Sequence, residues 1–219
     1  SLTGNSAVYI ASRISKDNDG FRQKVAIKVI LPILEKIMGQ SAVAHEAQII
    51  SQCNHHNIVK VLSSGRIEAD GIKFPCLVME YISGVNLLTH MNAERLDTVD
   101  RLKLFFDVCA AVKYLHSRPI IHGDLKPENI IVDETGCVKI VDFTLGVSEQ
   151  TKLSDYRGMS TEYASQEHLS GFAPTVACDV FSLGIILEHI IHGRTEGGSH
   201  IANNGKSLPI ISLTGTNAI

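Results

Sequence analysis

The sequence predicts an α+β fold in two lobes, a small β-rich lobe with one long helix followed by a mainly helical lobe. Two observations support this. Strand-like segments fill most of the first ~80 residues, with one helical segment among them. Helical spacing of apolar residues dominates the remainder of the chain. Apolar residues make up 44% of the 219 residues, which is enough to form a substantial core.

The first lobe begins with two strand-like segments, 7–12 and 24–30. Between them lies Lys-Asp-Asn-Asp-Gly at 16–20, and Asn, Asp and Gly all favour turns. We therefore expect the two segments to pair as an antiparallel hairpin.

A helix and a second strand pair follow in the first lobe. The segment 41–53 has apolar residues at positions 43, 47 and 50, a spacing that places them on one face of a helix. Two further segments, 58–68 and 74–82, have strand-like composition and predict another pair of strands.

Two helices are predicted in the second lobe. One begins at Asp97 or Thr98, either of which can cap it, and carries an apolar stripe that should face the core. The other covers residues 176–191, which are apolar nearly all round and should be buried. The final stretch is rich in Gly, Asn and Ser, so we expect little order there. The stripe of the first helix comprises Leu102, Phe105, Phe106, Cys109 and Val112.

Charge and composition exclude several classes of protein. The net charge is −3 and both signs are scattered along the chain, so no footprint for nucleic acid stands out. No apolar run approaches the roughly 18 residues that span a bilayer, and the chain lacks a signal-peptide start. The five cysteines, an odd number mostly in apolar segments, favour free thiols in a reducing compartment. We therefore expect a cytoplasmic protein.

Catalytic chemistry is indicated by residues 120–132, which read IIHGDLKPENIIV. A carboxylate at Asp124 can accept a proton from a hydroxyl nucleophile, and the amide oxygen of Asn129 can ligate a hard cation such as Mg²⁺. Lys126 would face developing phosphate charge. A second acid for the metal is available at Asp142, which follows another strand-like segment.

These residues, together with Lys28 in Val-Ala-Ile-Lys, resemble the signature set of protein kinases in both identity and order. The chain is therefore similar to a eukaryotic-type protein kinase from about residue 2 to 193. The resemblance implies a bilobal kinase-like domain over 1–193, with an N-lobe at about 1–80, a hinge at about 80–84 and a C-lobe at about 85–193. Under this resemblance, residues 194–219 would be a low-order or truncated end of the C-lobe. The chain would be either one domain of a larger multidomain protein or a domain by itself.

The resemblance also implies roles for individual residues. Asp124 would be the catalytic base, supported by Lys126 and Asn129, and the two metal ligands would be Asn129 and Asp142. Asp179 matches the acid that braces the catalytic loop in this family.

ATP and Mg²⁺ are the implied cofactors, and a protein with Ser or Thr is the implied substrate. Lys28 would hold the α- and β-phosphates and pair with Glu46, 18 residues further on. The adenine edge would meet the backbone of Glu80 and Ile82. The other nucleotide contacts implied are Gly4, Val8, Ala26 and, at the ribose, Asn86.

The sequence departs from the family pattern at several positions. Gly4 is the only glycine where a glycine-rich loop is expected, and Thr144 replaces the glycine of Asp-Phe-Gly. Gln166 stands in place of a proline, and little sequence follows His192 to complete the second lobe. Gly123 occupies the place of an arginine that binds a phosphate on the activation loop in many kinases, so we expect no dependence on such a phosphate.

Three functions remain in competition. The Ser/Thr-type DLKPEN pattern favours a protein serine/threonine kinase, whereas the poor glycine loop and Thr144 favour a pseudokinase that binds nucleotide or acts as a scaffold. A small-molecule phosphotransferase is disfavoured by the segments 161–167 and 176–192. A zinc site at Cys53, His55 and His56 is also disfavoured, because adjacent histidines rarely converge on one metal.

Overall fold

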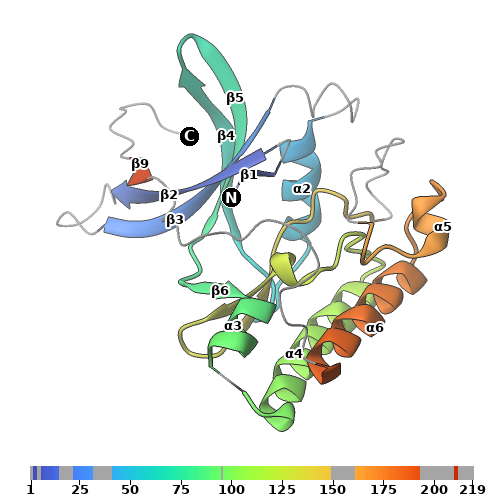
Figure 1. Cartoon of the computed structure of the whole chain (residues 1–219). Coiled ribbons are helices and arrows are strands. Elements are labelled where there is room, and N and C mark those ends of the chain that lie inside the picture. The colour runs from blue at the N-terminus through green and yellow to red at the C-terminus, as the bar shows by residue number, and fades with distance from the viewer. Residues whose placement is uncertain are drawn as a thin grey trace. The chain divides into compact units, whose positions relative to one another are not determined.

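The computed structural model describes residues 2–3, 6–14, 22–31, 41–94, 96–148, 161–192 and 210–211. The chain forms two compact units (Figure 1). The first comprises residues 1–47, 60–81 and 200–219, and the second comprises 48–59 and 82–199. Most strands lie in the first unit and the two longest helices lie in the second, which confirms the predicted α+β class.

The first unit is built on a sheet in the order β1-β2-β3-β5-β4, with β9 added in parallel to β2. β2 and β3 pair from Ser6 opposite Ile30 to Ile14 opposite Arg22, so the first predicted hairpin is confirmed. The turn residues 16–20 lie outside the described residues. The strands are β1 (Leu2–Thr3), β2 (Ser6–Ile14), β3 (Arg22–Ile30), β4 (Val61–Ala69), β5 (Ile72–Glu80) and β9 (Ile210–Ile211).

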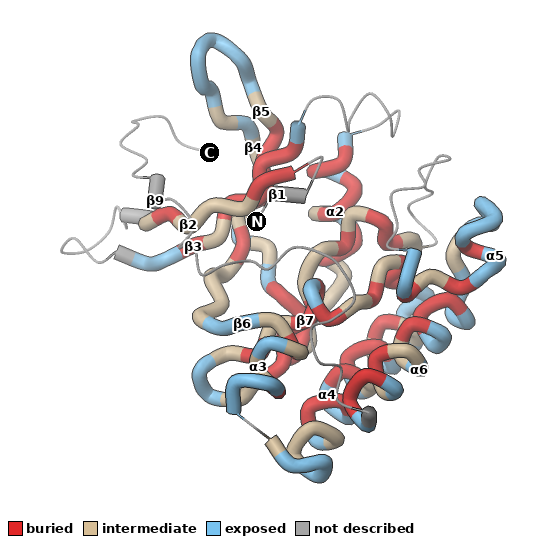
Figure 2. Tube along the Cα trace, viewed as in Figure 1, coloured by how far each residue is buried: buried red, intermediate tan, exposed pale blue. Residues whose placement is uncertain are grey.

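The second predicted strand pair is also present, with shifted ends. β4 begins at Val61 because Ile58 instead forms an isolated bridge with Ile140. The two strands are joined at Asp70 and Gly71, whose φ angles of 52° and 75° belong to the left-handed region of a tight turn. Figure 2 shows the exposed tip of this hairpin in pale blue. Buried side chains from three strands form the core of the sheet, namely Ala11, Val25, Ile27, Val29 and Cys76.

Helix α2 (Ala42–Ser51) follows in the chain and confirms the helix predicted there. The Ser41 hydroxyl accepts the N–H of Ala44 at 3.3 Å and so satisfies one of the unpaired donors at the helix start. Val43 and Ile50 are buried, as the spacing predicts. Two polar side chains of α2, His45 and Glu46, are buried as well.

The second unit combines a three-stranded sheet with helices (Figure 1). The sheet runs β6-β7-β8, and the long helices α4 and α6 lie side by side. The elements are β6 (Gly84–Asn86), α3 (Leu87–Ala93), α4 (Thr98–His116), the short 3₁₀ helix η1 (Pro127–Asn129), β7 (Ile130–Asp133), β8 (Val138–Ile140), α5 (Gln166–Leu169) and α6 (Val176–His192).

The start of α4 agrees with the sequence, but its predicted apolar stripe is partly wrong. Asp97 is the cap, since its carboxylate accepts the N–H of Asp100 at 2.9 Å. Phe106, however, is 66% exposed. The helix is rotated so that its buried face follows a different set of positions. That face consists of Leu104, Phe105, Val108, Ala111, Val112 and Leu115.

The prediction that α6 is buried on all sides is wrong, because some of its described apolar residues are exposed. Val180 and Ile191 are 55% and 54% exposed, whereas Ile186 and Ile190 on the opposite face are buried. The buried face meets α4 and includes Asp179.

Two further findings concern the helices and the cysteines. Within the described ranges, no helix is both long and apolar enough to cross a membrane. All five cysteines are free thiols.

Candidate active site

The loop that follows α4 carries the candidate catalytic residues. It is fixed at its start by two hydrogen bonds of 2.9 Å between the backbones of Ile121 and Val147. Gly123 then adopts φ +78°, and a Cβ there would lie 2.7 Å from the carbonyl oxygen of Leu145. Glycine therefore fits where the loop turns and passes close to another segment.

A buried carboxylate anchors this loop from α6. Asp179 accepts the backbone N–H groups of His122 and Gly123, both at 2.9 Å. The Nε2 atom of His116, at the end of α4, lies 2.8 Å from the same carboxylate. Asp179 is fully buried, so these contacts provide the hydrogen bonds that a buried charge requires. They also hold the backbone just before Asp124 in one position.

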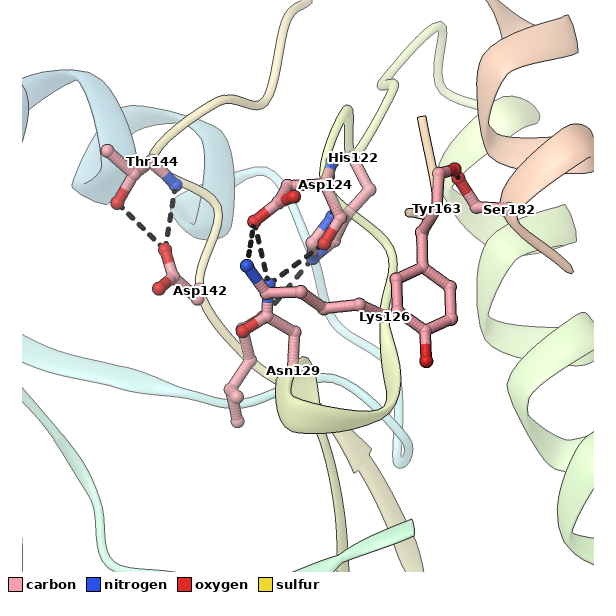
Figure 3. A network of polar contacts seen from close by, with 9 residues as sticks. His122, Asp124, Lys126, Asn129, Asp142, Thr144, Tyr163 and Ser182 are labelled. Atoms are coloured by element: carbon pink, nitrogen blue, oxygen red, sulfur yellow. Dashed lines mark hydrogen bonds and ion pairs between the residues drawn. The ribbon is translucent and has the colours of Figure 1, made fainter. Parts of the chain in front are cut away.

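Asp124 lies at the centre of a compact polar network (Figure 3). Its carboxylate accepts a hydrogen bond of 2.7 Å from the Lys126 ammonium and one of 3.3 Å from the Asn129 amide. The same amide donates to the Asp124 carbonyl oxygen at 2.8 Å. Three residues that the sequence singles out are therefore in direct contact, with Asp124 and Lys126 both only partly exposed.

His122 contacts this network through the backbone of Asp124. Its Nδ1 atom accepts the backbone N–H of Asp124 at 3.3 Å, so the ring proton belongs on Nε2, which lies 3.2 Å from the carbonyl oxygen of Val141. The ring also packs on Phe143, with 4.7 Å between centroids. His122 and Phe143 are both fully buried. One histidine thus links the catalytic loop to the segment that carries Asp142.

Asp142 has a φ angle of 65°, and its carboxylate is hydrogen-bonded to Thr144. The Thr144 hydroxyl donates to its carboxylate Oδ1 at 2.8 Å, and the Thr144 N–H lies 3.3 Å from the same oxygen. Both contacts are drawn in Figure 3. A glycine at this position could supply only the backbone contact.

A hard divalent cation fits the donors available here. The Val141 N–H donates to the Asn129 carbonyl oxygen at 2.9 Å, which brings the chain next to Asp142 alongside Asn129. Among the described residues there is no group of three or more His, Cys, Asp or Glu side chains able to hold a metal by themselves. Mg²⁺ suits such a sparse site, because it commonly takes one or two protein oxygens and completes its shell with water and phosphate.

In the first unit, Lys28 and Glu46 form a buried ion pair. The Lys28 ammonium donates to Glu46 Oε2 at 2.7 Å, with side-chain exposures of 3% and 0%. Lys28 projects from β3 and Glu46 from α2. The predicted pairing is therefore present in the structure.

Other predicted nucleotide contacts lie on the strands of the first unit. Val8 pairs with Lys28 in the register of β2 and β3, and Ala26 pairs with Met79 of β5. The Glu80 N–H is bonded to the Lys60 carbonyl oxygen at 3.0 Å, so an adenine contact through Glu80 would have to use its carbonyl group. Gly4 lies outside the described residues.

Two further predicted contacts belong to the second unit. Ile82 is half-buried in the segment that precedes β6. Asn86 is the cap of α3, and its side-chain oxygen accepts the Thr89 N–H at 2.9 Å. A ribose contact by Asn86 would therefore fall to its amide nitrogen.

The segment 161–169 is held on α6. The Ser182 hydroxyl donates to the Tyr163 carbonyl oxygen at 2.8 Å, and the Tyr163 hydroxyl lies 3.2 Å from Nδ1 of His189. His168 on α5 is buried, and burial lowers its pKa, against the opposing effect of the Asp124 and Asp179 carboxylates.

Two residues of the network were missed by sequence reasoning. His116 looked like an ordinary end of a helix, and His122 like part of an apolar run. The only local signal was the position of His122 two residues before Asp124. Its role becomes visible only through its contact with Val141, 19 residues away.

Comparisons with known proteins identify the family to which the sequence is similar. The family model described as protein kinase domain matches residues 6–208. The chain is 30% identical over 198 residues to "Serine/threonine-protein kinase PknB" of Mycobacterium leprae, which covers 87% of this chain and 31% of that protein. It is 34% identical over 191 residues to "CBL-interacting serine/threonine-protein kinase 21" of Arabidopsis thaliana, covering 85% and 43%. It is 31% identical over 172 residues to "Serine/threonine-protein kinase PrkC" of Bacillus subtilis, covering 77% and 25%. The chain thus spans less than half the length of these relatives.

Proposed function

Since the chain belongs to the protein kinase domain family, as its sequence predicted, we propose that it transfers the γ-phosphoryl group of ATP to Ser and Thr hydroxyls of proteins. The observation that carries the proposal is the contact of Asp124 with both Lys126 and Asn129 on a loop anchored by Asp179. The names of the curated relatives support the Ser/Thr class.

In the proposed reaction, Asp124 accepts the proton of the substrate hydroxyl as the hydroxyl oxygen bonds to the γ-phosphorus. The bond from that phosphorus to the bridging oxygen breaks, and ADP leaves with the electron pair. Lys126 and Asn129 orient the Asp124 carboxylate, and the Lys126 ammonium also places positive charge next to the base.

Binding of ATP is assigned to the residues that the resemblance to protein kinases implies. Lys28, held in place by Glu46, would bind the α- and β-phosphates. Asn129 and Asp142 would hold Mg²⁺, which when bound neutralises charge on the phosphate oxygens. The remaining contacts proposed are Gly4, Val8, Ala26, Glu80, Ile82 and Asn86.

The setting of the reaction is also part of the proposal. Free thiols at all five cysteines support a reducing, cytoplasmic location. The partners are then a protein substrate and ATP.

The direct test is transfer of labelled γ-phosphate from Mg²⁺-ATP to a generic basic protein. We expect Asp124→Asn to reduce the rate by about 10²- to 10⁴-fold, the usual effect of losing a general base. The amide keeps the size of the side chain, so binding of ATP should persist. Equal rates for wild type and variant would refute the role of Asp124.

A pseudokinase is the second candidate. The observation that favours it is the hydrogen bond to Asp142 from Thr144, a residue that stands where the kinase pattern has a glycine. The two functions are separated by measuring nucleotide binding independently of transfer. Mg²⁺-ATP should raise the melting temperature, because a ligand that binds only the folded state stabilises it. The shift should be smaller in Lys28→Met and Asp142→Asn. A wild-type protein that shows this shift but no transfer on any substrate would be a pseudokinase.

A further inference from the structure

A thiol and an imidazole meet outside the candidate active site. The Sγ atom of Cys137, in the turn between β7 and β8, lies 3.0 Å from Nε2 of His56. His56 belongs to the loop that follows α2, and 81 residues separate it from Cys137. Cys137 is half-buried and His56 is exposed, so small molecules can reach the pair from solvent.

Several hydrogen bonds hold the two segments together. The Asn57 amide donates to the Val138 carbonyl oxygen at 2.8 Å, and the Ile140 N–H donates to the Asn57 carbonyl oxygen at 2.8 Å. The Cys137 N–H donates to the Asp133 carboxylate at 2.9 Å. Because Asn57 directly follows His56, these bonds fix the imidazole opposite the sulfur.

Charged groups of both signs lie near the pair. The pKa of His55, the neighbour of His56 in the chain, is lowered by burial and then by the charges of His56, Arg118 and Lys139. The Asp133 carboxylate is the acidic neighbour. Its pKa is lowered, because bonds from Thr135 and Cys137 and the charge of Lys139 outweigh the effect of burial. Nearby cations stabilise a thiolate.

The other four cysteines are in different environments. Burial raises the pKa of Cys53 to about 11, against the opposing effect of Arg118. Burial is also the main cause of the raised pKa values of Cys76 and Cys109. Cys178 is buried, and its sulfur accepts the Ser165 hydroxyl at 3.4 Å. These four thiols serve as internal references for the reactivity of Cys137.

We propose that Cys137 and His56 form a peroxide-reactive site at which Cys137 is reversibly oxidised to a sulfenic acid. His56 takes the thiol proton, and the thiolate attacks one oxygen of hydrogen peroxide. An S–O bond forms and the O–O bond breaks, so sulfur loses two electrons and the peroxide gains them. The imidazolium returns its proton to the departing hydroxide, which leaves as water. An external thiol then condenses with the sulfenic acid to a mixed disulfide and water, and another external thiol attacks that disulfide and releases the Cys137 thiol.

The size of the effect follows from thiol chemistry. An ordinary cysteine is only a few per cent thiolate at pH 7. Transfer of the proton to His56 raises the thiolate fraction, although a more stable thiolate is also a weaker nucleophile. We therefore expect Cys137 to react about 3- to 4-fold faster with its histidine than without it.

The first test measures the alkylation rate of each cysteine by iodoacetamide at pH 7, using mass spectrometry. Cys137 should react first in the wild type. His56→Asn, which keeps a polar side chain but no base, should slow Cys137 by about 3- to 4-fold and leave Cys53 unchanged. His90→Asn, a histidine change on α3, is the matched control and should change neither rate. Equal Cys137 rates in wild type and His56→Asn would overturn the proposal.

The pH dependence gives a second readout that does not require equal folding of the variants. Between about pH 6.5 and 8.5 the Cys137 rate should rise only a few-fold in the wild type and much more steeply in His56→Asn, as for an ordinary thiol. Hydrogen peroxide followed by a dimedone probe should label Cys137 and not Cys53. Labelling of Cys53 and Cys137 to the same extent would show that the pair has no special reactivity. None of these readouts depends on phosphoryl transfer.

Discussion

The buried ion pair between Lys28 and Glu46 permits a sharp prediction about stability. We consider Glu46→Leu, which removes the carboxylate and leaves the Lys28 ammonium in a site where it is only 3% exposed. A buried ion pair contributes little over an apolar pair of similar size, but removal of one partner leaves the other charge buried without the carboxylate that compensated it at 2.7 Å. The single variant should therefore be much less stable than the double variant Lys28→Met/Glu46→Leu.

The expected magnitude follows from the burial of both groups. Breaking a buried pair typically costs about 3–5 kcal/mol. For a chain of this size each kcal/mol lowers the melting temperature by about 2–4 °C, so we expect a loss of roughly 6–20 °C for Glu46→Leu. The double variant should recover most of this loss, because two apolar side chains replace the two charges.

Thermal unfolding followed by circular dichroism, without nucleotide, measures the effect. Lys103→Gln is the matched control, since Lys103 also donates to a carboxylate, that of Asp100, at 2.7 Å but is 70% exposed. Water screens this exposed pair, so its loss should leave the melting temperature nearly unchanged. If Glu46→Leu melts no lower than Lys103→Gln, or if the double variant is as unstable as the single one, the reasoning about buried charge fails.

Three further predictions concern the second unit. Thr144→Val should weaken binding of Mg²⁺-ATP a few-fold in calorimetry and Thr144→Ser should not, because Ser keeps the hydroxyl that donates to Asp142 at 2.8 Å and Val loses it; equal affinities for both variants would contradict this. Burial lowers the pKa of His168 below its ordinary value of 6.5. As the pH falls through 6.5, His168 therefore binds a proton in the unfolded chain but not yet in the folded chain. The melting temperature should then fall between about pH 7.5 and 5.5, and His168→Leu should flatten this slope; parallel slopes would exclude His168 as a cause. Phosphatase treatment, checked by mass spectrometry, should change transfer activity by no more than a few-fold because Gly123 offers no cation to a loop phosphate; a large loss that rephosphorylation restores would identify another receptor.

The sequence by itself determined the local elements and the family. Apolar residues at 43, 47 and 50 predicted α2, and strand-like composition predicted the hairpin of β2 and β3. The order of Lys28, Asp124, Asn129 and Asp142 along the chain identified the resemblance, which the family comparison confirmed. These signals are local because they depend on helical and strand periods and on short motifs.

Only the tertiary structure decided which face of a helix is buried and which distant residues meet. The period of α4 allowed a stripe through Phe106, but the packing of α4 against α6 and β8 exposes that residue. His116 meets Asp179 across 63 residues, and His56 meets Cys137 across 81. A period fixes the spacing of buried side chains and not the orientation of the helix, and contacts between distant residues depend on how the elements pack, so neither could be read from the sequence alone.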